Sequence, residues 1–222
     1  MTRPQTLPRR ALLGLAAASL LLAAMPASLA AEDPYEDLLI ALKNENLPAI
    51  RKLVNRGMEI DTVDSAGSTL LMLASRGGNQ EIVAYLIASG AKVNHRNAYG
   101  DTALMWAALA GNLPVCRMLV EHGAEYDTEG WTPLIYAASK GHDAVVDYLL
   151  SLDVDIDATS ENGTTALMMA AQAGRITTVK LLLQHKADVN VKNQSGLTAM
   201  AWAQARKNTD IVKLLKAAGA TQ

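Results

Sequence analysis

Histidine and cysteine are the side chains of this sequence that could bind zinc or supply a nucleophile, and they are few. The four histidines, His95, His122, His142 and His185, are widely spaced, and Cys116 is the single cysteine. Zinc sites place Cys and His in closely spaced pairs, and no such pair occurs here. The nucleophile elbow G-x-S-x-G is also missing. The sequence therefore predicts no catalytic set, no metal and no cofactor.

The acidic segment DVDID, residues 153–157, is the best candidate for a cation site. Alternating acids resemble the start of a calcium-binding loop, which also needs Gly at its sixth position and Glu at its twelfth. Ala158 and Thr164 occupy those positions here. Calcium binding is therefore not predicted.

The first thirty residues have the order of a secretory signal peptide. Arg3, Arg9 and Arg10 precede the apolar run ALLGLAAASLLLAAM, and small residues then offer a cleavage site before Ala31. A membrane anchor is the alternative, but the run is shorter than the about 20 apolar residues of a spanning helix. We predict a cleavable signal peptide over residues 1–30 and a periplasmic location, reached by the general secretory or the twin-arginine route.

The charge that remains after cleavage is acidic. The chain has 20 basic and 22 acidic residues, and the leader holds three arginines and no acid, which leaves 17 bases and a net charge of −5. Nucleic-acid binding needs a basic surface, so this balance argues against it. A single cysteine forms no internal disulfide, so packing must stabilise the exported chain.

Five copies of Gly-x-Thr reveal an internal repeat. Their threonines are spaced by 33, 30, 33 and 33 residues: Thr69, Thr102, Thr132, Thr165 and Thr198. Each copy predicts a short helix that begins at the threonine hydroxyl and in most copies ends at a glycine. A second apolar helix such as EIVAYLIASG follows. One such unit cannot cover its own apolar face, whereas stacked units can.

The repeat resembles the ankyrin repeat family. Its consensus D-x-x-G-x-T-P-L-H-x-A-A is nearly matched by DTEGWTPLIYAASKGH. The segment KADVN nearly matches the later consensus G-A-D-V-N of the loop. The resemblance implies an all-α fold, a solenoid of about six helix-turn-helix repeats with hairpin fingers at one edge. Over the predicted ankyrin repeat domain, residues 31–222, we place the repeats at 33–64 (N-terminal cap), 65–97, 98–127, 128–160, 161–193 and 194–222 (C-terminal cap).

The sequence departs from that consensus in three ways. Apolar residues replace the consensus histidine in every copy: Met72, Met105, Ile135, Met168 and Ala201. Dispersion contacts are therefore expected in place of the family's polar network between repeats. The finger before Gly130 is three residues short and should be clipped. Asp153 and Lys186 stand where a capping glycine is usual, so those helix ends should close less tightly.

Partners of ankyrin repeats generally lie on the concave face, against finger tips and the outward positions of first helices. The resemblance places six candidate partner-binding residues there: Tyr99, Asp101, Leu109, Glu129, Trp131 and Lys140. Large aromatic residues are typical interface anchors, which favours Tyr99 and Trp131. The alternative for Trp131 is local packing over the clipped finger. Trp106, Tyr136 and Trp202 share another repeat position and are interpreted as half-buried core.

These observations favour a non-catalytic binding module, similar to exported bacterial ankyrin repeat proteins. It would be a monomer that holds one protein partner, with no nucleic acid and no membrane contact after signal cleavage. An inhibitor or immunity protein, a scaffold, and a stabiliser of a periplasmic enzyme such as a peroxide-detoxifying one all fit. The alternative is a hydrolase whose site is built across repeats, which would need convergent acids around Asp101 and Glu129.

Overall fold

The computed structural model describes residues 34–221. The predicted signal peptide, residues 1–30, lies outside the described residues. The chain divides into two units, 1–32 and 33–222, and the described residues belong to the second unit.

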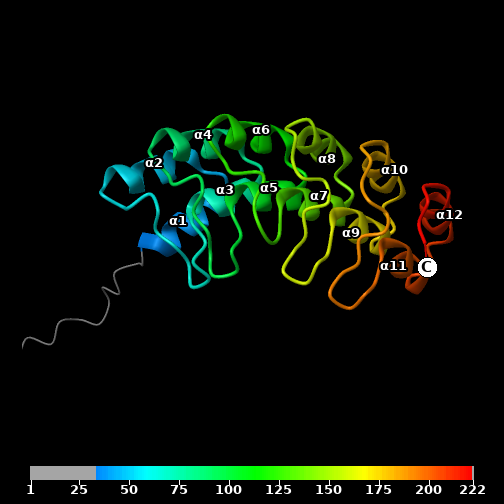
Figure 1. Cartoon of the computed structure of the whole chain (residues 1–222). Coiled ribbons are helices and arrows are strands. Elements are labelled where there is room, and N and C mark those ends of the chain that lie inside the picture. The colour runs from blue at the N-terminus through cyan, green and yellow to red at the C-terminus, as the bar shows by residue number, and fades with distance from the viewer. Residues whose placement is uncertain (1–33, 222) are drawn as a thin grey trace, which may run out of the picture. The chain divides into compact units, whose positions relative to one another are not determined.

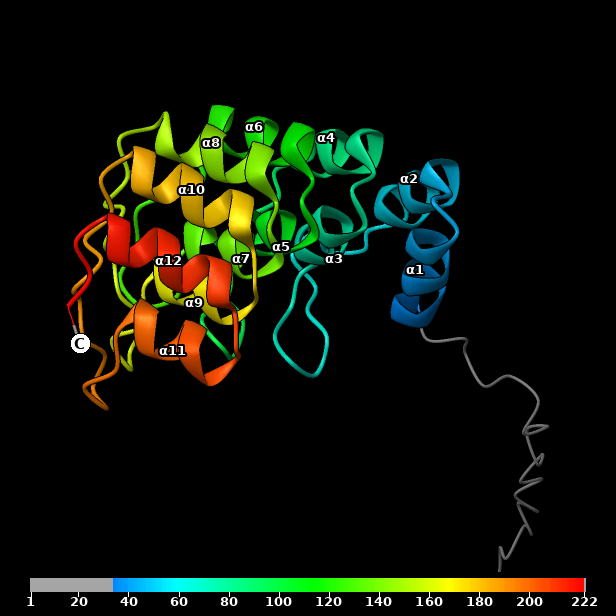
Figure 2. The same ribbon diagram turned by 90° about the vertical axis from the view of Figure 1, so that its right-hand side faces the viewer.

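Six helical hairpins make up the described part of the chain. The first helices of the hairpins are α1 (Pro34–Lys43), α3 (Leu70–Gly77), α5 (Ala103–Ala110), α7 (Pro133–Lys140), α9 (Ala166–Gln172) and α11 (Ala199–Ala205). The second helices are α2 (Leu47–Asn55), α4 (Gln80–Ala88), α6 (Leu113–Glu121), α8 (Asp143–Leu150), α10 (Ile176–Gln184) and α12 (Thr209–Ala217). Figures 1 and 2 show the first and second helices in two separate layers, with the connecting loops hanging from one edge. The predicted all-α solenoid of six repeats is confirmed.

The Gly-x-Thr motif builds the start of each first helix. In α5 the hydroxyl of Thr102 accepts a hydrogen bond from the backbone N–H of Met105 at 3.3 Å, and Thr132 does the same for Ile135 at 3.2 Å. The helix then ends at Gly111, whose φ of 77° lies in the left-handed region that glycine enters without strain. The capping scheme predicted for the first helices is confirmed for α5.

Among residues 34–221, four residues other than glycine adopt the left-handed conformation. Glu45, Asp153, Lys186 and Lys207 have φ between 52° and 67° and stand at positions that other repeats fill with glycine. The predicted loose end is wrong for Lys186, because the N–H of Ala187 reaches the carbonyl of Leu182 at 3.1 Å. At the end of α8, beside Asp153, no such bond is made within the described residues. The stack imposes the turn even where the side chain opposes it.

Small side chains let the first helices pack closely against one another. Ala107 and Ala108 of α5 are fully buried between α3 and α7. Met105 and Ile135, at the position of the missing histidine, are also fully buried. Dispersion contacts therefore hold the centre of each repeat junction, as predicted. No helix among the described residues is long and apolar enough to cross a membrane.

Candidate partner-binding surface

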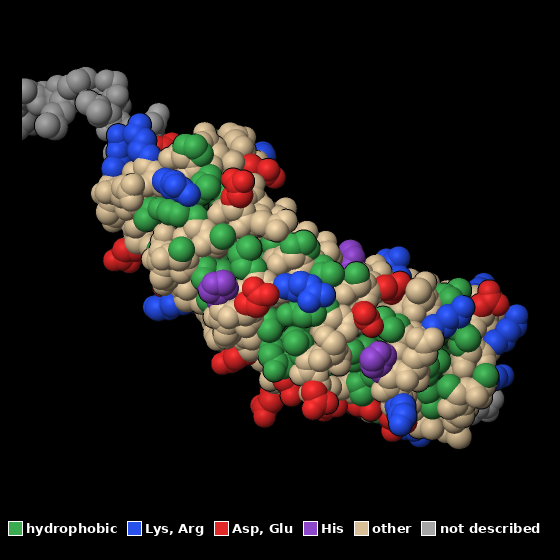
Figure 3. Space-filling model, turned by 90° about the horizontal axis from the view of Figure 1, so that it is seen from above, with side chains coloured by type: hydrophobic (Ala, Val, Ile, Leu, Met, Phe, Trp, Pro, Cys, Tyr) green, Lys and Arg blue, Asp and Glu red, His purple; other side chains and the backbone are tan. Residues whose placement is uncertain are grey.

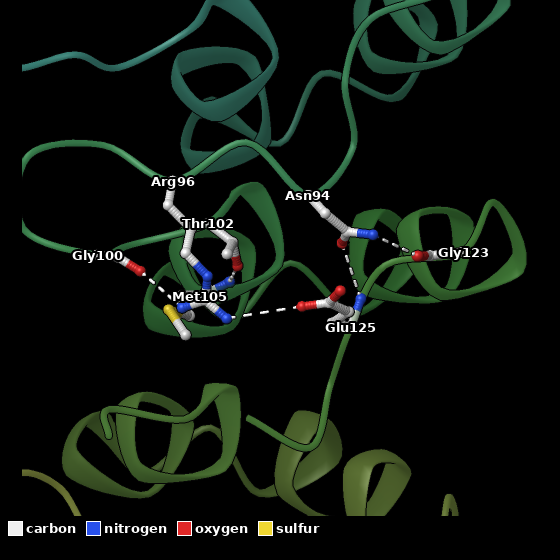
Figure 4. A network of polar contacts seen from close by, with 7 residues as sticks. All are labelled: Asn94, Arg96, Gly100, Thr102, Met105, Gly123 and Glu125. Atoms are coloured by element: carbon white, nitrogen blue, oxygen red, sulfur yellow. Dashed lines mark hydrogen bonds and ion pairs between the residues drawn. The ribbon is translucent and has the colours of Figure 1, made fainter. Parts of the chain in front are cut away.

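Polar side chains nonetheless connect the loops of successive repeats. The side-chain oxygen of Asn94 accepts the N–H of Glu125 at 2.9 Å, and its amide donates to the carbonyl of Gly123 at 2.8 Å (Figure 4). Asp61 and Asp157 accept backbone N–H groups of the following repeats in the same way, at 2.9 Å. The expected replacement of all polar links by dispersion is thus wrong at the loops.

A second set of polar links joins the hairpin turns. The amide of Asn112 donates to the carbonyl of Ser75 at 3.1 Å, and Nε2 of His142 lies 3.0 Å from the carbonyl oxygen of Leu109. His142 therefore has a structural role at the repeat junction. These bonds satisfy carbonyl groups that the ends of the first helices leave open.

The loop between α6 and α7 breaks the row of fingers. It spans residues 122–132, against 89–102 before it and 151–165 after it, and Figure 1 shows it reaching less far than the yellow and orange loops. We call residues 124–131 of this loop the short finger. The clipped finger predicted from the 30-residue spacing is confirmed.

The six candidate residues fall into two groups. Tyr99, Asp101, Glu129 and Trp131 lie on two successive fingers, near the N-terminal ends of α5 and α7. Two others lie toward the opposite ends of the same helices: Leu109 in α5 and Lys140 in α7. The structure thus gathers four of the six at the fingers and places the other two along the first helices.

Exposure separates the two predicted anchors. Tyr99 is 79% exposed, the most exposed of the large hydrophobic side chains among the described residues. Trp131 is half-buried, and its ring lies 5.2 Å from the ring of Tyr136, centroid to centroid, at a tilt of 34°. The ring of Tyr99 is therefore open to solvent. The ring of Trp131 is partly exposed and partly packed on Tyr136, as the alternative of local packing expects.

Asp101 joins two repeats rather than facing solvent alone. One carboxylate oxygen accepts the hydroxyl of Tyr136 at 2.6 Å, and the other accepts Nε1–H of Trp106 at 3.2 Å. Both aromatic residues are half-buried, as predicted from their repeat position. The hydrogen bonds by which Trp106 and Tyr136 hold Asp101 in place were not predicted from the sequence. The signal that could have found it is the recurrence of a polar-tipped aromatic at this position in two successive repeats.

The charge around Tyr136 is negative. Burial raises the pKa of its hydroxyl, and the hydrogen bond to Asp101, the charge of Asp101 and the charge of Glu161 raise that pKa further. The hydroxyl therefore remains a donor to Asp101 at any physiological pH. Because both oxygens of Asp101 are engaged, no observation favours its use as a general base in the hydrolase alternative.

The side chains that could do chemistry are occupied by the fold. Cys116 is fully buried, and burial raises the pKa of its thiol from the ordinary 9.0 to about 12. Asp155 and Asp157 accept backbone N–H groups of Asp157 and Asp188. Within residues 34–221 no group of three or more His, Cys, Asp or Glu side chains could hold a metal ion.

The layer of second helices carries charges of both signs. Figure 3 shows that face, where basic and acidic side chains are interspersed with hydrophobic ones. Three ion pairs are present among the described residues, Lys92–Asp61, Arg96–Glu125 and Lys213–Asp210, and each has at least one largely exposed partner. Such pairs contribute little to stability.

Stacked helical hairpins that carry a row of loops along one edge define a helical repeat protein. The family model for ankyrin repeats matches residues 17–97, 38–129, 90–160 and 152–222. The chain belongs to the ankyrin repeat family.

The solved structures agree with that assignment. The crystal structure of the human ASB11 ankyrin repeat domain is similar at a TM-score of 0.76 and 28% identity, over 83% of this chain and 84% of that one. In all, 608 chains of solved structures match, so the fold alone singles out no partner. No curated protein matches.

Proposed function

We propose that this chain is a non-catalytic interaction module of the bacterial periplasm, which binds one protein partner through its fingers and first helices. Ankyrin repeats indicate a protein–protein interaction module, and the family is typically non-catalytic. The leader-like segment at residues 1–30 supports export. The acidic balance of residues 31–222 does not suit nucleic acid.

The exposed ring of Tyr99 carries the proposal. The side chain projects from a finger whose backbone is fixed, because Oδ1 of Asn97 accepts the N–H groups of Tyr99 and Asp101 at 2.9 Å. A second finger supports this one, since the N–H of Ala98 reaches the carbonyl of Ala66 at 3.0 Å. An aromatic ring held in water on a rigid loop adds contact area at small entropic cost when a partner covers it.

The role of that binding is one of two kinds. An inhibitor or immunity protein would mask the active surface of a toxin or enzyme. A scaffold or stabiliser would hold a periplasmic enzyme, such as a peroxide-detoxifying one, without blocking it. The two are separated by the partner's activity, which an inhibitor lowers and a stabiliser preserves on heating.

Capture from a periplasmic extract tests the proposal with matched variants. Tyr99→Ala should leave melting unchanged, because the side chain is 79% exposed, and should weaken retention of the partner by about 30-fold, as for a hot-spot residue worth ~2 kcal/mol. Ile176→Ala, which shortens a 39% exposed side chain of α10 in the second layer, is the control. Equal retention by wild type and Tyr99→Ala would count against the finger surface.

A further inference from the structure

The short finger lacks one kind of bond that joins the longer fingers. Before it, the N–H of Ala98 bonds to the carbonyl of Ala66, and after it the N–H of Gln194 bonds to the carbonyl of Asn162, both at 3.0 Å. Within the described residues no backbone-to-backbone hydrogen bond of this kind joins the short finger, residues 124–131, to another finger. Its links to the preceding repeat run instead through the side chains of Asn94 and Arg96, which both contact Glu125.

Partly exposed aromatic rings lie on the short finger and on its neighbours. Trp131 ends the short finger and packs on Tyr136 of α7, and each ring is only half-buried. Tyr99, on the preceding finger, is exposed. Part of the surface of each ring is thus open to solvent.

Three carboxylates lie on the short finger or next to its residues. Asp101 contacts the hydroxyl of Tyr136 at 2.6 Å. Glu161, on the following finger, lies over the short finger, because its Oε1 is 2.7 Å from where a Cβ on Gly130 would stand. Glu129 is exposed on the short finger itself. None of these three acids belongs to any of the ion pairs of the described residues, so their charge is not neutralised by the chain.

At other repeat junctions of the chain, arginine side chains lie over aromatic rings. The guanidinium carbon of Arg76 lies 4.8 Å from the ring centroid of Trp106, the residue that Tyr136 matches one repeat later. Arg51 over Tyr85 and Arg117 over Tyr148 repeat the arrangement in the second layer, at 5.1 Å and 4.3 Å. At Tyr136 the position of Arg76 is taken by Leu109. Within the described residues this junction has aromatic rings and carboxylates but no arginine.

We propose that the aromatic and acidic surface around Trp131 receives an arginine side chain from an extended segment of the protein partner. The guanidinium would stack on Trp131 and Tyr136 and meet the carboxylates of Glu161 and Glu129. A planar guanidinium combines stacking on aromatic faces with paired hydrogen bonds to carboxylates, which the compact ammonium of lysine does less well. The inference rests on the proposed function, since it names the chemistry of the partner at the same surface.

The indole signals of the ¹⁵N-labelled protein provide the test. The three tryptophans, Trp106, Trp131 and Trp202, give three indole N–H resonances, and Trp202 in α11 is the internal control. The probes are acetyl-Gly-Arg-Gly-amide and its Gln and Lys counterparts. We expect the Arg peptide to shift the Trp131 signal saturably, with a Kd on the order of 1–10 mM for a single side chain. The Trp202 signal should stay in place.

Charge variants make the test specific. Glu161→Gln should weaken the Arg peptide about threefold, as expected for an exposed charge pair. Glu121→Gln removes the same charge from α6 in the second layer and should have no effect. Equal shifts with the Gln peptide, equal affinity in Glu161→Gln and wild type, or no saturable shift would overturn the proposal. A Lys peptide that binds as tightly as the Arg peptide would overturn its assignment to arginine.

The inference and the proposed function fail in different ways. If Tyr99→Ala loses the captured partner while Glu161→Gln retains it fully, the finger surface stands and the arginine site is wrong. If neither variant changes capture, both are wrong.

Discussion

Removing the hydroxyl of Tyr136 isolates the bond that joins the third and fourth repeats. In Tyr136→Phe the ring contact with Trp131 at 5.2 Å is kept, and the 2.6 Å hydrogen bond to Asp101 is lost. A hydrogen bond to a charged group contributes about 1.5–3 kcal/mol. Both residues are half-buried, so water can replace the hydroxyl at Asp101, and Trp106 still donates to the carboxylate. We therefore expect a loss of about 1–2 kcal/mol in the free energy of unfolding.

Urea unfolding followed by circular dichroism measures this loss. Tyr85→Phe is the matched control, because Tyr85 is also half-buried and its hydroxyl makes no hydrogen bond within the described residues. It should change the free energy of unfolding by less than about 0.5 kcal/mol. A loss in Tyr136→Phe no larger than in Tyr85→Phe would refute the view that Asp101 ties the two repeats together.

Three further predictions concern stability. Leu104→Ala empties a fully buried site in α5 and should cost about 2–5 kcal/mol in urea unfolding, and a loss under about 0.5 kcal/mol would mean that the repeat register is wrong. Asp153→Gly and Lys186→Gly relieve left-handed strain at φ of 60° and 67°, and each should raise the free energy of unfolding by about 0.5–1 kcal/mol; a loss in both would contradict the strain argument. The Cys116 thiol has a pKa of about 12 in the folded chain and near 9.0 in the unfolded chain. The free energy of unfolding should therefore fall as pH rises from 9 to 12, by at most about 1.4 kcal/mol per pH unit. Cys116→Ala should flatten that fall. An unchanged pH profile in Cys116→Ala would show that the buried thiol is not its cause.

Local sequence features predicted the repeat unit well. Thr102 and Gly111 determine where α5 begins and ends through bonds within a few residues, and such bonds can be inferred from residue types alone. The deficit of three residues before Gly130 likewise predicted the short finger. The resemblance to the ankyrin family supplied the stacking that these local features do not specify.

Contacts between repeats were less predictable. Asp101 meets Tyr136 across 35 positions of the chain, and neither residue alone signals the bond. The left-handed turn at Lys186 was missed for a related reason, because neighbouring repeats impose a conformation that the residue itself disfavours. The hydrogen bonds that Asn94 and Asp157 accept from the following repeats also could not be predicted until the alignment of neighbouring repeats in the stack was known.

Photo-crosslinking in the source cell tests the central claim most directly. A photoreactive phenylalanine at position 99 lies on the exposed finger, and the same group at position 176 lies on the second layer. The binding account predicts one discrete crosslinked protein from position 99 and none from position 176. A crosslink from position 176 alone, or from neither position, would contradict an action through the fingers.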